Sequence, residues 1–267
     1  MIRRIQVDWD VEGNPTISMT QSYFAWRELC RLRNVQMEAT ASRMEVCTLC
    51  HGDGIVQSDE YGWMNCICVV MDRLREKKAA LAPYRGMVRK NTFNGFRPWG
   101  SQESRKLLAE IKKHLKAWTI WPDRWVTLIG EVGTGKSHLL EAAANEIGPM
   151  ALYISAFDLE AHIYKAVRSD YLGQLILTME TAPVLLYDDM GSEHGSEFVN
   201  DTVQAIFMSR YQRPLEYPTV VATNLDEESV RNIQPRMADR ILDRSIADVF
   251  PLKGIVSWRA NGPTETR

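Results

Sequence analysis

The chain has 267 residues, which suits one large or two modest domains. A hydrophobic fraction of 45% is ordinary for a globular protein, and a net charge of −2 gives no global argument for nucleic-acid binding. No stretch approaches the roughly 18 consecutive apolar residues of a membrane helix, and the amino-terminal residues do not form a secretory signal. We therefore expect a cytoplasmic protein whose cysteines are ligands or thiols rather than disulfides.

The segment up to about Arg43 carries few signals. Gly13 and Pro15 mark a turn, and the stretch from Tyr23 to Leu32 has a helical pattern. Cys30 lies in this stretch, apart from the other cysteines, and we expect it to pack rather than to bind a metal. This part of the chain is expected to belong to a small docking domain.

Four cysteines in a short span form the first informative motif. Cys47 and Cys50 make a C-x-x-C pair that two glycines follow, and Cys66 and Cys68 close the segment, with a hairpin expected between the pairs. This set suits one tetrahedral zinc ion, which four protein ligands would make structural. A redox C-x-x-C would not need the second pair, and ordinary buried cysteines would have no reason to cluster. Because C-x-C is a tight spacing, His51 could replace one ligand.

A basic helix and linker are expected over residues 69–90. Seven basic residues and one acidic residue lie from Arg73 to Lys90, which could contact nucleic-acid phosphates or form a solvated helix face. Pro83 ends the helix, so we place the domain boundary between it and Asn91. The two domains are then residues 1–90, with the zinc knuckle at 47–68, and residues 91–267.

A phosphate-binding loop follows an amphipathic helix in the second domain. The apolar run Trp125–Ile129 predicts a buried strand, residues 130–137 fit G-x-x-x-x-G-K-[ST] at each defined position, and a helix-forming stretch begins at His138. A chance glycine-rich turn would lack these flanks. The expected nucleotide-binding residues are Gly130, Glu131, Val132, Gly133, Thr134, Gly135, Lys136, Ser137 and His138.

The spacing of this loop matches the chemistry of a nucleoside triphosphate. The glycines allow successive backbone N–H groups to face a phosphate, and the following helix directs the positive end of its dipole there. Lys136 would reach the β- and γ-phosphates of ATP, and the Ser137 hydroxyl would bind Mg²⁺.

Strands and helices alternate beyond the loop. Residues 183–189 form an apolar run that ends in Asp188 and Asp189, which is the form of a Walker B element. Asp188 would hold Mg²⁺, and Asp189 would activate the attacking water. Asp189 is shorter than the glutamate common at such positions, which favours slow turnover. Another apolar strand ends at Asn224, whose amide could bridge the water and the γ-phosphate, although an asparagine there also fits a simple turn.

From Thr92 to Arg259 the chain resembles AAA+ ATPases of the bacterial helicase-loader type, the DnaC/DnaI group, within the IstB-like superfamily. The shared motifs are Thr92-Phe93-x-x-Phe96, Gly130–Ser137, Asp188-Asp189-Met190-Gly191-Ser192-Glu193, Arg210-Tyr211, Pro218-Thr219, Thr223-Asn224-Leu225 and Ala238–Arg244. They cover about two-thirds of the chain, in the same order as in the family. The resemblance implies an α/β fold: an AAA+ three-layer sandwich with a central parallel sheet, after a small zinc-binding domain.

The resemblance also implies roles for residues outside the loop. Asn224 would be sensor 1, Arg244 a finger acting on a neighbouring subunit's ATP, and Arg259 a sensor-2-like arginine. The helices between Phe157 and Glu180 would line a path for single-stranded DNA. The candidate contacts there are Tyr164, Lys165, Arg168 and Tyr171, although aromatic residues at helical spacing are more often core.

Three functions fit these features. The first is an ATP-driven loader whose zinc domain binds a DnaB-type helicase and whose ATPase domains self-assemble on single-stranded DNA. The second is an IstB-type transposition helper that assembles on duplex DNA, for which the zinc knuckle is not expected. The third is a non-hydrolysing adaptor that uses ATP only as an assembly signal. Ser245 follows Arg244 at a position where the family commonly has leucine or methionine, so the chain departs from the family pattern there.

Overall fold

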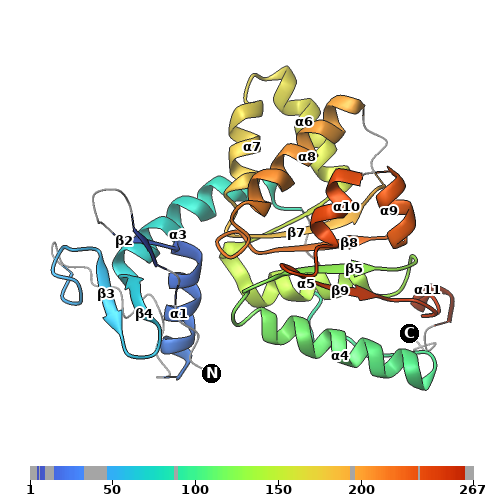
Figure 1. Cartoon of the computed structure of the whole chain (residues 1–267), viewed down its shortest axis with the longest axis horizontal. Coiled ribbons are helices and arrows are strands. Elements are labelled where there is room, and N and C mark those ends of the chain that lie inside the picture. Colours follow the sequence, from blue (N-terminus) through green and yellow to red (C-terminus); the bar gives the residue numbers. More distant parts are fainter. Residues whose placement is uncertain are drawn as a thin grey trace. The chain divides into compact units, whose positions relative to one another are not determined.

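The computed structural model describes residues 5, 7–9, 15–32, 47–86, 90–192, 196–233 and 235–261 (Figure 1). The chain divides into two compact units, Met1–Ala80 and Leu81–Arg267. This division falls before the boundary that the sequence suggested, because Leu81 and Tyr84 are buried in the core of the second unit.

The first unit contains two small hairpins and two helices. Its elements are β1 (Val7–Trp9), β2 (Pro15–Ile17), α1 (Met19–Leu32), β3 (Ile55–Ser58), β4 (Gly62–Asn65) and α3 (Ile67–Leu81). β1 pairs with β2 and β3 pairs with β4, both antiparallel. The hairpin expected between the two cysteine pairs is therefore present, and the helix expected after them is α3.

Asn65 connects the cysteine hairpin to the rest of the first unit. Its side-chain amide donates to the carbonyl of Ile17 at 3.0 Å, and its backbone N–H donates to the Ser22 hydroxyl of α1 at 3.0 Å. The indole N–H of Trp26, also on α1, donates to the Asn65 carbonyl at 2.9 Å. Because Asn65 directly precedes Cys66, these bonds fix the position of the second cysteine pair against α1.

The second unit is an alternating α/β domain. Its elements are the short helix η1 (Ala82–Tyr84), α4 (Gln102–Trp118), β5 (Trp125–Ile129), α5 (Lys136–Ile147), the short helix η2 (Gly148–Met150), β6 (Ala151–Ser155), α6 (Ala156–Arg168), α7 (Leu172–Glu180), β7 (Val184–Met190), α8 (Glu197–Tyr211), β8 (Thr219–Thr223), α9 (Glu227–Ile233), α10 (Pro235–Ile241), β9 (Ala247–Pro251) and α11 (Trp258–Asn261).

The five strands form one parallel sheet in the order β6-β7-β8-β5-β9. Helices α4 and α5 lie on one side of it, and α6 to α10 lie on the other (Figure 1). β5 and β8 are buried along their whole lengths, which is why they read in the sequence as continuous apolar runs rather than as alternating patterns. The expected three-layer α/β fold with a central parallel sheet is confirmed.

A buried arginine joins the helices to the amino-terminal edge of this sheet. The Arg210 guanidinium is fully buried and donates to the carbonyls of Met179, Ala182 and Pro218 at 2.8–3.0 Å. These carbonyls stand at the end of α7 and just before β7 and β8. The arginine therefore holds the start of β7, which carries Asp188, and the start of β8, which Asn224 follows. Within the described residues, no helix is long and apolar enough to cross a membrane.

Candidate nucleotide site and cysteine cluster

The loop between β5 and α5 has the backbone shape that the glycine spacing predicts. Gly133 and Gly135 adopt left-handed φ angles of 84° and 91°, which non-glycine residues rarely adopt. A Cβ atom at Gly135 would lie 2.8 Å from ring atoms of both Phe96 and Trp99, so a larger residue would collide there as well. The loop thus depends on glycine both for its turn and for its contact with the segment that precedes α4.

The Lys136 side chain lies inside this loop. It is 4% exposed, and its Nζ donates to the carbonyls of Gly130 at 2.6 Å and Glu131 at 2.8 Å. Burial lowers the pKa of Lys136 to about 8, although the carboxylates of Asp188 and Asp189 act in the opposite direction. The ammonium group is therefore held against the carbonyls of the loop, at the start of a twelve-residue helix whose dipole favours an anion.

The Asp188 carboxylate faces the loop from the end of β7. It is buried, and it accepts from the Tyr153 hydroxyl at 2.8 Å and from the backbone N–H of Asp189 at 2.9 Å. The Ser137 hydroxyl also bonds to it. Ser137 and Asp188, expected as Mg²⁺ ligands, are thus brought together, and a hydroxyl beside a carboxylate fits the oxygen ligands that Mg²⁺ prefers. Tyr153 is a contact that sequence reasoning missed, because it depends on the pairing of β6 with β7.

Asp189 and Asn224 meet at the same edge of the sheet. The Asn224 amide donates to Asp189 Oδ1 at 3.0 Å. Asp189 has a φ of 56°, and the pairing of β7 with β8 shifts register between Tyr187 and Met190. The irregularity thus lies at the residue whose carboxylate bonds to Asn224, and left-handed backbone at a non-glycine residue is found most often at functional sites.

The carboxyl-terminal segment contacts the phosphate-binding loop. The backbone N–H of Trp258 donates to the Gly133 carbonyl at 2.9 Å, and a side chain at Gly133 would collide with Ser257. The rings of Trp258 and Trp99 stack edge to face with centroids 5.0 Å apart. Arg259, the expected sensor-2-like arginine, follows Trp258 in α11 and so lies in a segment fastened to the loop. No motif in the sequence indicates the Ser257 contact.

Arg244 lies at the opposite edge of the sheet from the loop. β9 runs parallel to β5, with Trp125 opposite Ala247 and Ile129 opposite Pro251. The loop follows Ile129 at the carboxyl edge, whereas Arg244 precedes Ala247 at the amino edge, so at least about 13 Å of strand separates the two positions. Arg244 is exposed, and within the described residues its guanidinium has no hydrogen-bond or ion-pair partner.

One face of α6 carries exposed aromatic and basic side chains. Tyr164 is 40% exposed, and Lys165 and Arg168 are exposed beside it. Phe157, which sequence reasoning missed, is 74% exposed and lies seven residues before Tyr164, on the same face. Tyr171, by contrast, packs against the core, which leaves less of its ring accessible.

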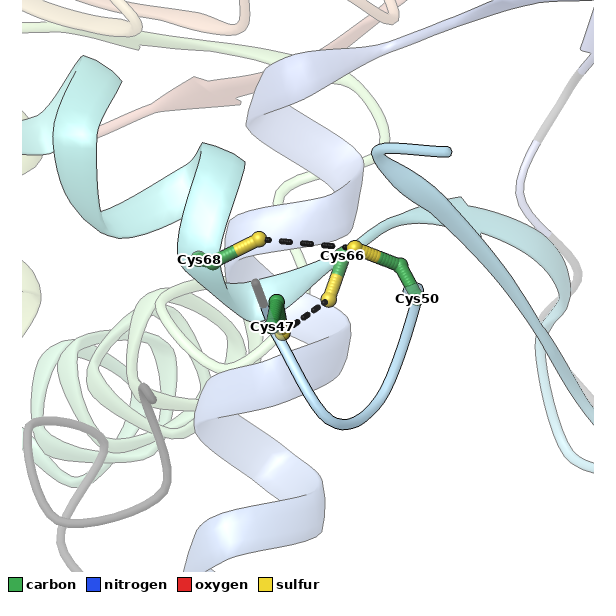
Figure 2. A group of neighbouring side chains, drawn as sticks. All are labelled: Cys47, Cys50, Cys66 and Cys68. Atoms are coloured by element: carbon green, nitrogen blue, oxygen red, sulfur yellow. Dashed lines mark hydrogen bonds between the residues drawn. The ribbon is translucent and has the colours of Figure 1, made fainter. Parts of the chain in front are cut away.

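The four cysteine sulfurs of the first unit converge (Figure 2). All lie within 4.8 Å of one another, and the Cys47–Cys66 and Cys50–Cys68 pairs are each separated by 3.7 Å. Sulfurs at the corners of a tetrahedron with zinc bonds of about 2.3 Å are about 3.8 Å apart. The donor set and its spacing therefore fit Zn²⁺, and the ligands would be Cys47, Cys50, Cys66 and Cys68.

The local backbone explains why these four residues meet without His51. The carbonyls of Cys47 and Cys50 accept from the N–H groups of His51 at 2.8 Å and Asp53 at 2.9 Å, which closes a tight knuckle. His51 has a φ of 51° and is exposed, and it is not part of the cluster. Burial raises the pKa of the Cys66 thiol, and it raises the pKa of the Cys68 thiol to about 11. A bound cation would therefore be needed to keep both as thiolates at neutral pH.

The parallel sheet and the phosphate-binding loop define the second unit as a P-loop ATPase domain. Residues 126–246 match the family model "ATPase family associated with various cellular activities (AAA)". This part of the chain is therefore similar to AAA-type ATPase domains, as the motifs predicted.

Curated relatives of the chain are bacterial replication proteins. It is 26% identical over 110 residues to the replicative helicase loader DnaI of Bacillus subtilis, a match that covers 39% of this chain and 34% of that protein. It is 27% identical over 118 residues to the chromosomal replication initiator protein DnaA of Aquifex aeolicus, covering 43% of this chain and 29% of that protein. These matches confirm the resemblance to helicase loaders, and they span about a third of the relatives' own lengths.

A solved structure shares the fold of the second unit. The structure of AMPPCP-bound DnaA from Aquifex aeolicus aligns with a TM-score of 0.51 and 22% identity, covering 62% of this chain and 51% of that one. The similarity supports the AAA fold that the sheet order and the loop define.

Proposed function

We propose that this protein is an ATP-driven loader that places a hexameric DnaB-type helicase on single-stranded DNA. The observation that carries the proposal is the division of the ATPase machinery between two edges of one sheet. The candidate nucleotide site lies at the carboxyl edge, and Arg244, whose side chain has no partner among the described residues, lies at the amino edge. Such a domain completes its site only when a second copy supplies the arginine, and its sequence relatives include a helicase loader.

The residues at the carboxyl edge divide the chemistry of ATP hydrolysis among them. The residues from Gly130 to His138 and the start of α5 would hold the phosphates, with Lys136 turned from the loop carbonyls to the β- and γ-phosphate oxygens. Ser137 and Asp188 would hold Mg²⁺, which offsets the negative charge of the phosphates. Asp189 would accept the proton of the attacking water, while Asn224 holds Asp189 in place and orients the water.

Two arginines would respond to the γ-phosphate. Arg259 follows Trp258, the first residue of α11, whose backbone N–H bonds to the loop, so ATP bound at the loop would affect the position of the carboxyl-terminal segment. Arg244 would reach the γ-phosphate of the next copy and stabilise the charge that develops during transfer. Assembly would therefore follow ATP binding, and hydrolysis would release it.

The exposed face of α6 is the proposed contact with single-stranded DNA. Phe157 and Tyr164 offer rings on which bases can stack, and Lys165 and Arg168 offer charges for the phosphates. Such a contact is tolerant of sequence because every base has a face on which a ring can stack. Tyr171 contributes less, since it packs on the core.

The first unit is the proposed helicase-binding module. A structural Zn²⁺ at the cysteine cluster would stabilise a unit that is too small to be stabilised by its own core alone. The IstB-type transposition helper remains the alternative function, and it differs in its DNA: it would assemble on duplexes rather than on single strands.

Mixing two inactive variants tests the shared site. Arg244→Ala copies bind ATP but lack the finger, and Lys136→Ala copies keep the finger but lack the loop lysine. Each variant alone should hydrolyse ATP at least tenfold more slowly than the wild-type protein on single-stranded DNA. An equimolar mixture should recover part of the rate, because Arg244 of a Lys136→Ala copy can reach the ATP that an Arg244→Ala copy binds.

The DNA requirement separates the two candidate functions in the same assay. Recovery that needs single-stranded DNA supports the loader, whereas recovery on duplex DNA only supports the transposition helper. A wild-type rate for Arg244→Ala alone would contradict the shared site in either function. Arg213→Ala removes another exposed arginine, which lies in the turn between α8 and β8 and pairs with Glu216 of its own chain; it is the control and should leave the rate unchanged.

A further inference from the structure

The loop that carries Arg244 is held by a second arginine. Arg124 stands immediately before β5, and its guanidinium donates to the carbonyls of Arg244 at 2.8 Å and Ser245 at 3.1 Å. It also donates to the Ala247 carbonyl at 3.4 Å and to the Asp248 carboxylate at 3.0 Å. One side chain therefore bonds to four of the five residues from 244 to 248.

We call these bonds from Arg124 to residues 244–248 the Arg124 clamp. The position of Arg124 itself is also held by hydrogen bonds of the backbone around it. The indole N–H of Trp118, a buried residue at the end of α4, donates to the Arg124 carbonyl at 2.6 Å. The next residue, Trp125, donates its backbone N–H to the Ile246 carbonyl at 2.9 Å. Arg124 thus reaches the loop from a position that the domain core determines.

Asp243 closes the loop from the other end. Its carboxylate accepts from the backbone N–H of Ser245 at 2.9 Å and from the Tyr211 hydroxyl of α8 at 2.6 Å. The Ser245 and Tyr211 hydroxyls lower the pKa of Asp243, so its carboxylate stays ionised at neutral pH. With both ends held and the carbonyls of Arg244 and Ser245 directed to Arg124, the Arg244 side chain is left to project into solvent.

We propose that Arg124 is a positioning residue that presents Arg244 to the ATP of a second copy of this chain. Its planar fork matches several carbonyl oxygens at once, which an ammonium or an apolar side chain cannot do. The guanidinium of Arg124 is engaged within its own chain, so it does not compete for the neighbour's phosphate. This inference rests on the proposed role of Arg244. It implies that the amino edge of the sheet presents a preformed loop to the second copy, and not only a single exposed side chain.

Replacing the fork tests the inference in the full-length protein. Arg124→Met keeps the apolar stem of the side chain and removes its hydrogen-bond donors. Arg124→Lys keeps the stem and the positive charge but removes the planar fork. For Arg124→Met we expect ATP hydrolysis on single-stranded DNA to fall three- to tenfold, with the affinity for a fluorescent ATP analogue within twofold of wild type. The hydrolysis rate of Arg124→Lys should lie between those of wild type and Arg124→Met. Arg124→Lys also serves as the second variant if the methionine variant does not fold. Arg213→Met is the matched control.

Mixing distinguishes positioning from a general structural role. Lys136→Ala copies carry an intact finger loop, so they should raise the hydrolysis rate per Arg124→Met copy, whereas Arg244→Ala copies should not. A loss that Lys136→Ala copies do not rescue would overturn the inference, because the defect would then lie in the Arg124→Met copy's own nucleotide site.

The Arg244→Ala variant, measured alongside, separates this inference from the proposed function. If Arg244→Ala hydrolyses ATP slowly while both Arg124 variants hydrolyse it at the wild-type rate, the role of Arg124 is overturned and the shared site is not. A wild-type rate in Arg244→Ala would overturn the shared site, and the clamp with it.

Discussion

Replacing Lys136 with alanine is expected to abolish detectable ATP binding while the domain stays folded. The lysine is the one cation of the loop that the fold buries against the phosphate position. Hydrogen bonds to charged groups contribute about 1.5–3 kcal/mol each, so losing two or more of them lowers the affinity by more than about two orders of magnitude. Titration with a fluorescent ATP analogue in the presence of Mg²⁺ measures the effect.

Lys112 supplies the matched control. Its Nζ donates to the Phe96 carbonyl at 3.0 Å, in the segment that packs on the loop, without facing the phosphate position. Lys112→Ala should bind the analogue within a few-fold of wild type. Normal affinity in Lys136→Ala would overturn the assignment of the loop as the nucleotide site.

Removing the metal from the cysteine cluster is expected to unfold the first unit and to leave the second intact. Structural zinc contributes about 10–16 kcal/mol to the folding of small zinc domains, which is as large as the whole stability of an ordinary domain. Asn65 couples the cluster to α1, so the loss should spread beyond the knuckle. A strong chelator, or Cys66→Ser, should make the first unit sensitive to protease while ATP affinity stays unchanged.

Metal analysis of the purified full-length protein checks the same prediction directly. One zinc ion per chain is expected in the wild-type protein and in Cys30→Ser, which changes a cysteine outside the two ligand pairs. Cys66→Ser should have lost its zinc. A wild-type protein without zinc, or one whose first unit resists protease after chelation, would contradict the assignment.

The sequence was most informative where the site is local in the chain. Strand, glycine loop and helix follow one another between Trp125 and Ile147, so the loop could be predicted from a single stretch. The two carboxylates and Asn224 could be predicted to lie close together. Each comes at the end of an apolar run, and parallel strands end at the same edge of a sheet. The four cysteines were identifiable from their spacing, but only the structure shows that His51 is not part of the cluster.

Contacts between distant segments could not be predicted in the same way. The bond from Tyr153 to Asp188 depends on the register of two strands that two helices separate. The clamp of Arg124 on the Arg244 loop joins residues about 120 positions apart, and it exists because β9 adds to the sheet beside β5. Phe157 could have been found from its helical spacing to Tyr164, but its exposure could not. Packing decides such contacts, and a single sequence does not encode them locally.

The most direct test of the proposed function is the mass of the complex that the full-length protein forms with a DnaB-type helicase from the same host or phage. The two proteins are mixed with ATP on single-stranded and on duplex DNA, and the masses of the assemblies are measured. The loader account predicts an ATP-dependent complex with the helicase that forms on single-stranded DNA and is lost in Lys136→Ala. Absence of helicase binding, together with ATP-dependent filaments on duplex DNA, would contradict it.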